Sequence, residues 1–120
     1  MKLEIFRTLW GYTASKTQAL EELLEAGFDG MEARLPLGAA ERAEFAAFLR
    51  ANRLGYISTV FTAYDVLPEQ SATVAEHLID LDKKLGWASE LSPRFVNVLA
   101  GNDRWQLPQQ VDFFGQALEL

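Results

Sequence analysis

Polar and aromatic residues that could hold a hydroxylated small molecule follow each of four short apolar runs in this chain of 120 residues. In folds built on parallel strands, ligands bind at the carboxyl ends of the strands, so residues just after apolar runs are the first candidates. Carboxylate, guanidinium, amide and aromatic groups suit such a ligand. The candidates are Arg7, Thr8, Trp10 and Tyr12; Glu32 and Arg34; Thr62, Tyr64 and Asp65; and Asn102, Asp103, Arg104 and Trp105.

Alternation within the runs gives some of these residues a direction. If Met31 and Val98 face the helices, then Glu32, Arg34 and Asn97 face the opposite side of the sheet, toward a barrel axis. Charged residues are rarely buried unless they are paired. Glu32 and Arg34 therefore form either a substrate-orienting pair, with a carboxylate suited to metal binding or proton transfer, or a polar network inside the barrel.

Three other candidates each have two interpretations. Trp10 either stacks on the face of a sugar or covers apolar area beside a neighbouring loop. Gly101, Asn102 and Asp103 either bring the backbone close to a ligand, with Trp105 as a wall, or form a strand-to-helix turn with Asp103 as the helix cap. We favour the turn for Asp103.

Several kinds of site are excluded by composition. The chain has no cysteine and a single histidine, His77, so it contains no thiolate metal site, no HExxH motif and no Ser-His-Asp set. His77 lies in a predicted helix, away from the strand ends, and is interpreted as a surface or packing residue. Neither common glycine-rich phosphate loop occurs. The spacing alone thus defines no complete active site.

The elements that must position these residues alternate in type. Short apolar runs at 3–6, 28–33, 56–62 and 94–100 predict strands, and the last is the clearest. Helical periodicity predicts helices that open at Ser15, cover 40–52, start near Thr73, and begin at Pro108 and run to the end of the chain. Gln18 and Glu76 complete two predicted capping boxes.

Two further patterns concern the helices. Gly27 is predicted as a left-handed helix end. The predicted buried positions are Leu20, Leu23 and Leu24 in the first helix, Phe45, Phe48 and Leu49 in the second, and Val74, Leu78, Leu81 and Leu85 in the third.

Residues 1–120 are predicted to form a single α/β unit of four strand-helix repeats around a parallel sheet, since no linker or charge block divides them. Such units build either one half of a closed TIM (β/α)8 barrel or an open, flavodoxin-like sheet. We favour the half-barrel.

Three segments carry a family resemblance: residues 6–11 (FRTLWG), 26–34 (AGFDGMEAR) and 95–103 (FVNVLAGND). They resemble the xylose isomerase-like barrel superfamily, the sugar phosphate isomerase/epimerase group, and the whole chain corresponds to its amino-terminal half. The resemblance implies an isomerase or epimerase for a sugar or related polyol, with a divalent metal (Mn, Mg or Zn) held mainly by later strands. It implies for Glu32 a substrate contact or a supporting role. The histidines of the endonuclease branch of the superfamily are absent after the third and fourth strands.

Further expectations concern partners and activity. A formal charge of -6 opposes binding to nucleic acid or to an anionic membrane surface, and no apolar run is long enough to span a bilayer. We therefore expect a cytoplasmic protein that binds a small molecule. The chain alone is expected to be inactive and to bind no metal tightly. The rival interpretation is a non-catalytic half-barrel that forms a homodimer, or pairs with a second half, through its exposed sheet edges.

Overall fold

Four strands alternate with four helices in the computed structural model, which describes residues 3–13, 15–64 and 69–120. In chain order the elements are β1 (Phe6–Thr8), α1 (Lys16–Glu25), β2 (Gly30–Arg34), α2 (Ala39–Asn52), β3 (Gly55–Phe61), α3 (Val74–Ser89), β4 (Phe95–Leu99) and α4 (Leu107–Ala117). The predicted α/β class and the alternation of strand and helix are confirmed.

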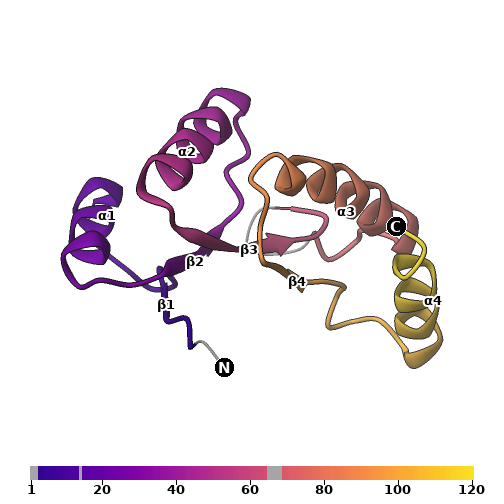
Figure 1. Ribbon diagram of the computed structural model, residues 1–120. Helices are drawn as coiled ribbons and strands as arrows, with labels where there is room; N and C mark the ends of the chain where they lie inside the picture. The colour runs from indigo at the N-terminus through magenta and orange to yellow at the C-terminus, as the bar shows by residue number, and fades with distance from the viewer. Residues whose placement is uncertain (1–2, 14, 65–68) are drawn as a thin grey trace.

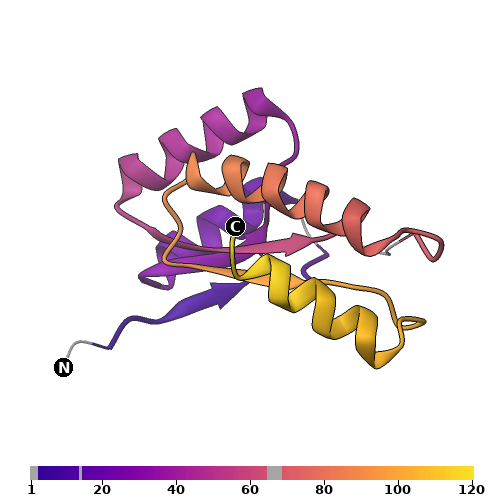
Figure 2. The ribbon, with the colours of Figure 1, turned by 90° about the vertical axis from the view of Figure 1, so that its right-hand side faces the viewer.

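The strands form one sheet in the order β1-β2-β3-β4, and every neighbouring pair is parallel. Helices α1, α2 and α3 lie over the same face of the sheet, and α4 lies past β4 beside α3 (Figure 1). The strand arrows point in one direction (Figure 2). A flavodoxin-like sheet changes strand order and carries helices on both faces. The described strands do neither, so the open-sheet alternative is not supported.

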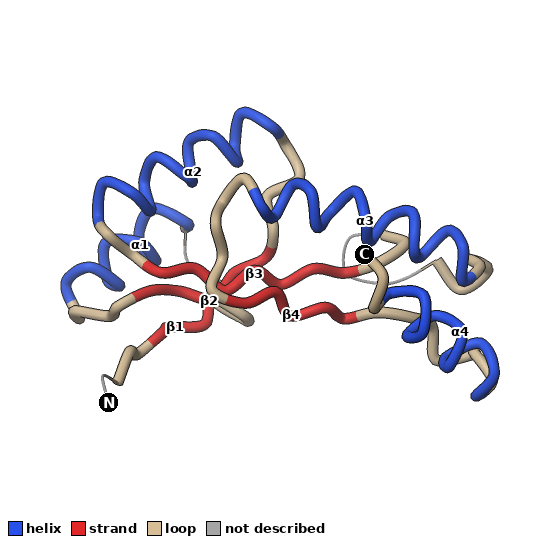
Figure 3. Tube along the Cα trace, turned by 45° about the vertical axis from the view of Figure 1, so that its right-hand side comes forward, coloured by secondary structure: helices blue, strands red, loops and turns tan. Residues whose placement is uncertain are grey.

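The register of the strands decides which side chains face the helices. Residues paired in a parallel ladder point to the same face, and Met31 pairs with Tyr56 under the helices, where both are buried. The intervening residues, Glu32 and Arg34 among them, point to the other face, which no described helix covers (Figure 3). We call this the uncovered face; its members are Phe6, Thr8, Gly30, Glu32, Arg34, Gly55, Ile57, Thr59, Phe61, Phe95, Asn97 and Leu99. The predicted directions of Met31, Val98, Glu32, Arg34 and Asn97 are confirmed.

The hydrophobic core fills the space between the helices and the opposite face of the sheet. The Tyr56 ring meets Phe45 of α2 edge-on, with ring centroids 5.1 Å apart, and its hydroxyl donates to the backbone oxygen of Ala33. Burial raises the pKa of Tyr56 to about 12, so the phenol stays protonated. The core thus joins β2, β3 and α2 into the part of the fold that supports the uncovered face.

Two glycines shape the amino end of the uncovered face. A Cβ on Gly30 would lie 2.4 Å from the backbone oxygen of Gly55 and 2.4 Å from the Phe6 ring, and a Cβ on Gly55 would lie 2.6 Å from the same ring. Only glycine, which has no side chain, leaves room for the Phe6 ring at these two positions, so the ring packs directly on the backbone of Gly30 and Gly55. Phe6 therefore closes one end of the face, while the polar residues lie toward the other.

Helix termini follow the local signals closely. The Thr73 hydroxyl accepts from the Glu76 backbone N–H and the Glu76 carboxylate accepts in return, so this capping box is confirmed. At α1 the Ser15 side chain accepts from the Gln18 backbone, but the Gln18 amide bonds Glu22 instead of returning to Ser15. Gly27 has the predicted left-handed conformation, with a φ of +71°.

Some predicted boundaries are wrong. The first strand begins at Phe6 and not at residue 3, because the residue before it, Ile5, donates its N–H to the Asp29 carboxylate instead of to a ladder. The other strands differ from prediction by one or two residues at each end. Helix α4 does not run to the end of the chain but stops at Ala117, with Leu118 as its cap.

The predicted buried stripe of α3 is correct for Leu81 and wrong for its other three residues. The buried residues are His77, Leu81, Lys84 and Ala88, which are spaced four, three and four apart and so share one face. Three residues of the predicted stripe are only partly buried at its flank: Val74, Leu78 and Leu85. The true stripe contains a histidine and a lysine because both find partners in the segment that follows β3.

Candidate functional site

A cleft of about 860 Å³ opens at the carboxyl ends of β1, β2 and β3. Its lining comes from the end of β1 and the β1–α1 loop, from Leu20 of α1, from the end of β2 and Pro36 after it, from Glu41 and Phe45 of α2, and from one residue each of β3 and β4. Three of the predicted site residues, Trp10, Glu32 and Arg34, line it together. A cleft at this end of a parallel sheet is the usual place for a small-molecule site.

Glu32 is held in place by the fourth strand. The Asn97 side-chain amide donates to the Glu32 carboxylate over 2.6 Å, across the width of β3. The bond uses one oxygen of the carboxylate, and the second oxygen retains its capacity to accept from a hydroxyl group. Asn97 therefore orients Glu32 from outside the cleft lining.

An aromatic wall borders the cleft. The Trp10 ring stacks on Phe61 at 5.7 Å between centroids and 26° between planes, and the Arg34 guanidinium lies 5.8 Å from the same Phe61 ring. Trp10 remains 59% exposed, so most of its surface is available for further contacts. The packing role predicted for Trp10 is thus observed, against Phe61, and stacking on a sugar stays a prediction.

The β1–α1 loop that carries Trp10 is fastened to α1 by a polar cluster. Glu22 accepts from Arg7 over 3.0 Å, and the Arg7 guanidinium lies 5.1 Å from the centre of the Tyr12 ring. Hydrogen bonds from Tyr12, Arg7 and Gln18, in that order, lower the pKa of Glu22. Desolvation first, and then the contact with Glu22, raise the pKa of Tyr12. The cluster keeps the loop beside the strand ends.

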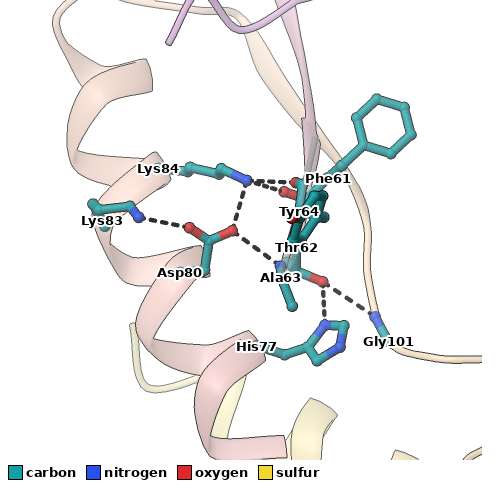
Figure 4. Close-up of polar contacts among 9 residues, drawn as sticks. All are labelled: Phe61, Thr62, Ala63, Tyr64, His77, Asp80, Lys83, Lys84 and Gly101. Atoms are coloured by element: carbon teal, nitrogen blue, oxygen red, sulfur yellow. Dashed lines mark hydrogen bonds and ion pairs between the residues drawn. The ribbon is translucent and has the colours of Figure 1, made fainter. Parts of the chain in front are cut away.

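The carboxyl end of β3 is clamped by α3 (Figure 4). The Lys84 ammonium, buried with 6% exposure, donates to the backbone oxygens of Phe61 and Tyr64 at 2.7 and 2.8 Å and pairs with Asp80 at 2.6 Å. Asp80 in turn accepts the Ala63 N–H at 3.0 Å. Burial alone would raise the pKa of Asp80, but hydrogen bonds from the neighbouring lysines lower it overall. The clamp fixes the residue, Phe61, against which Trp10 and Arg34 lie.

Asp103 and Trp105 do not line the cleft. Trp105 is buried between α3 and α4, where its ring lies 4.7 Å from His77 and 5.5 Å from Phe113. Asp103 is exposed and lies in the predicted turn, where the Trp105 N–H donates to the Asn102 oxygen, but its predicted cap role is wrong, because the cap of α4 is Gln106. The roles of Asp103 and Trp105 in ligand binding stay predictions, without support from their positions.

Asn102, a candidate for ligand contact, has a structural role that sequence reasoning missed, and the position of His77 was predicted only in part. Asn102 is buried; its side chain accepts from the Arg104 N–H and donates to the Gln70 oxygen, which links two carboxyl-end loops. His77 is fully buried against Trp105 and Phe113, which confirms it as a packing residue, but it contacts Thr62 directly after β3, so its predicted distance from the strand ends is wrong. The spacing of His77 with Leu81 was the available signal. Asp65, another candidate, lies outside the described residues.

The residues of the cleft do not fit a divalent metal. Its lining contains two carboxylates, Glu32 and Glu41, and Glu32 already accepts from Asn97. Over the described ranges, no group of three or more histidine, cysteine, aspartate or glutamate side chains comes close enough to hold an ion. No step of a reaction is therefore assigned to a metal held by this chain.

Comparison with known proteins gave no assignment, since neither the models of known protein families nor the curated proteins include a match to this chain. Among the helices described, none is both long and apolar enough to cross a membrane.

Proposed function

We propose that this chain is the amino-terminal half of a xylose isomerase-like (β/α)8 barrel and that its cleft binds a sugar or related polyol which the complete barrel isomerises or epimerises. The observation that carries the proposal is the convergence of Glu32, Arg34 and Trp10 in one cleft at the carboxyl ends of the strands. Sequential strand order with helices α1, α2 and α3 on one face (Figure 1) also supports a barrel.

The three side chains divide the recognition of a polyol between them. The Glu32 carboxylate, oriented by Asn97, accepts hydrogen bonds from hydroxyl groups, and the Arg34 guanidinium donates to hydroxyl or carbonyl oxygens. Trp10 packs on the apolar C–H face of a sugar ring. Isomerisation further requires a base that moves a proton between neighbouring carbons, and the second half of the barrel supplies what the described residues lack.

Titration of this chain with unlabelled aldoses, ketoses, inositols and sugar phosphates, followed by ¹H–¹⁵N NMR, tests the binding site. We expect saturable shifts of the Trp10, Glu32 and Arg34 amides with a Kd of about 1–10 mM, the weak affinity of a half-formed site. Trp10→Ala should abolish the shifts. Glu21→Gln, a charge change on the exposed side of α1, is the matched control. Shifts absent for every compound at ~100 mM, or unchanged in Trp10→Ala, would contradict the proposal.

Catalysis is tested in a complete barrel that contains this chain. Glu32→Gln should lower turnover while the circular dichroism spectrum and melting temperature stay close to those of the parent protein. Unchanged kinetics would remove Glu32 from the mechanism.

A second candidate function is a half-barrel that pairs with a copy of itself, and the exposed apolar residues around β4 favour it. Phe95 and Leu99 on the uncovered face are 69% and 50% exposed. Helix α4 and its carboxyl-terminal cap add an exposed stripe, spaced four, three and four apart: Leu107, Val111, Phe114 and Leu118. At roughly 100 Å² per side chain these residues offer on the order of 600 Å² per copy, near the ~800 Å² of a standard interface.

Sedimentation velocity of this chain at ~10–100 µM distinguishes the two candidates, since a self-paired half-barrel is a dimer in this range. Phe114→Glu should then yield a monomer. Ile79→Glu, on the outer side of α3 and 71% exposed, is the matched control and should leave the dimer intact. A wild-type monomer at every concentration contradicts self-pairing without affecting the sugar-binding proposal.

A further inference from the structure

His77 is a fully buried titratable group at the junction of four elements. It lies on α3, its Nδ1 is 2.7 Å from the Thr62 hydroxyl after β3, and its ring contacts Trp105 before α4 and Phe113 within α4. The Thr62 hydroxyl also accepts the Gly101 N–H at 3.2 Å, from the segment after β4 (Figure 4). One imidazole and one hydroxyl therefore join the β3–α3 and β4–α4 connections.

The second ring nitrogen of His77 has no polar partner. Of the buried side-chain nitrogen and oxygen atoms in the described part of the chain, Nε2 of His77 is the one without a hydrogen bond. Its neighbours are aromatic, because the Trp105 and Phe113 rings lie nearly perpendicular to the imidazole at 68° and 83°. In such pairs an N–H can point into an aromatic face, which is a weak but favourable contact.

The hydrogen bonds determine the protonation state. The Thr62 hydroxyl oxygen already accepts the Gly101 N–H, and its own hydrogen needs an acceptor. The nearest acceptor is Nδ1 of a neutral His77, so the Thr62 hydroxyl donates to it. The hydrogen of the neutral ring then sits on Nε2, facing the aromatic rings. A second proton on Nδ1 would meet the Thr62 hydroxyl hydrogen, so the pair would have to rearrange.

We propose that His77 is a proton-sensitive latch, whose neutral imidazole fastens the β3–α3 loop to the β4–α4 segment through Thr62 and whose protonation releases that connection. The charged groups that act on the ring lie on its own helix: Asp80 and Glu76 favour the charged imidazole, and Lys84 opposes it. The described residues packed against it from the other elements are Thr62, Trp105 and Phe113, which carry no charge. Burial is the largest influence and lowers the pKa of His77 below 6.5.

The expected dependence on pH follows from the sign of that shift. When the folded pKa is lower than the unfolded one, the unfolded chain binds more protons, and stability falls as the pH drops below about 6.5. Between the two pKa values the folding equilibrium constant should fall about tenfold per pH unit. The carboxylates with lowered pKa, such as Glu76, act only below about 4.5, so the interval from pH 7 to 5 isolates His77.

The experiment uses the fact that the chain has a single histidine. Long-range ¹H–¹⁵N spectra of the wild-type chain should show one imidazole, protonated at Nε2 at pH 7, with a folded pKa below 6.5. The Gly101 amide should lose most of its protection from hydrogen exchange as this ring titrates. A ring protonated at Nδ1 at pH 7, a folded pKa at or above 6.5, or unchanged protection of Gly101 would overturn the latch.

Urea unfolding at several pH values provides the second readout. His77→Gln, which keeps a side-chain amide for Thr62 and cannot titrate, should lack the decline in stability between pH 7 and 5 that the wild type shows. An equal decline in both proteins would also overturn the proposal. If His77→Gln does not fold, the spectra of the wild-type chain decide alone.

Discussion

The Lys84 clamp makes the sharpest prediction about stability, because the chain provides its own control. Lys83 and Lys84 are neighbours on α3 and both pair with Asp80, at 2.8 and 2.6 Å. Only the side chain of Lys84 is buried, with 7% exposure against 51% for Lys83. Replacing each with methionine removes the same charge from the same partner and keeps a similar apolar length.

The expected costs differ because the partners differ. Lys84→Met leaves the backbone oxygens of Phe61 and Tyr64 without their donor and Asp80 with one lysine fewer. Each buried group that loses its hydrogen bond costs about 1–3 kcal/mol, and breaking a buried ion pair costs about 3–5 kcal/mol. Asp80 keeps Lys83 and the Ala63 N–H, so the ion-pair cost does not apply in full, and the two backbone oxygens set the expected loss of about 3 kcal/mol in the free energy of unfolding, or roughly 10 °C in Tm. Lys83→Met should cost below about 1 kcal/mol.

Urea unfolding at pH 7, followed by circular dichroism and analysed by linear extrapolation, measures both variants. The slope m should stay unchanged, which would show that the variants alter stability and not the extent of unfolding. If Lys84→Met loses no more stability than Lys83→Met, the lysine does not clamp β3 and its burial has no energetic consequence.

Two further predictions concern local geometry. Gly30→Ala should destabilise the fold by about 2 kcal/mol or more, because the added Cβ would lie 2.4 Å from backbone and from the Phe6 ring. Gly86→Ala is the control: it has open space around it in α3 and should stabilise the fold by about 0.5–1 kcal/mol. Equal effects of the two substitutions in thermal melts would contradict the packing at Phe6. Thr73→Ala should cost about 1 kcal/mol at pH 7. Hydrogen bonds from Thr73 lower the pKa of the Glu76 carboxyl, so the capping box stabilises the fold above about pH 4.5, and this stability is lost as the pH falls through the lowered pKa. If Thr73→Ala loses the same stability at pH 3 and at pH 7, the link between the cap and the Glu76 carboxylate is refuted.

Local rules predicted the elements of this fold well because the information they use is local. The caps at Ser15 and Thr73 depend on residues three positions away, and both hydroxyls accept the expected backbone N–H. The direction of Glu32 and Asn97 follows from the period of two in a strand, which the backbone imposes. These two residues were therefore placed on one face correctly, and the bond between them was within reach of prediction.

Prediction failed where polar residues are buried by partners distant in sequence. His77 and Lys84 are polar, so a search for an apolar stripe on α3 passes over them. Both nevertheless face the sheet, because His77 hydrogen-bonds with the Thr62 hydroxyl and Lys84 donates to the Phe61 backbone oxygen. Loop residues failed for a similar reason. Asp103 lies in the predicted turn, in which the Trp105 N–H donates to the Asn102 oxygen, but the side chain that bonds this turn to a second loop is that of Asn102.

The buried polar residues of α3 explain how the cleft keeps its shape although an exposed loop forms part of it. Phe61 is the last residue of β3, and both Trp10 and Arg34 lie against its ring. Lys84 donates to the backbone oxygen of Phe61, and His77 contacts the hydroxyl of the next residue, Thr62. His77 and Lys84 are seven positions apart on α3. Two turns of α3 thus fix the Phe61 ring, which both Trp10 and Arg34 contact. Recognition residues on the β1–α1 loop, β2 and β4 consequently depend on a helix that contributes no side chain to the cleft lining.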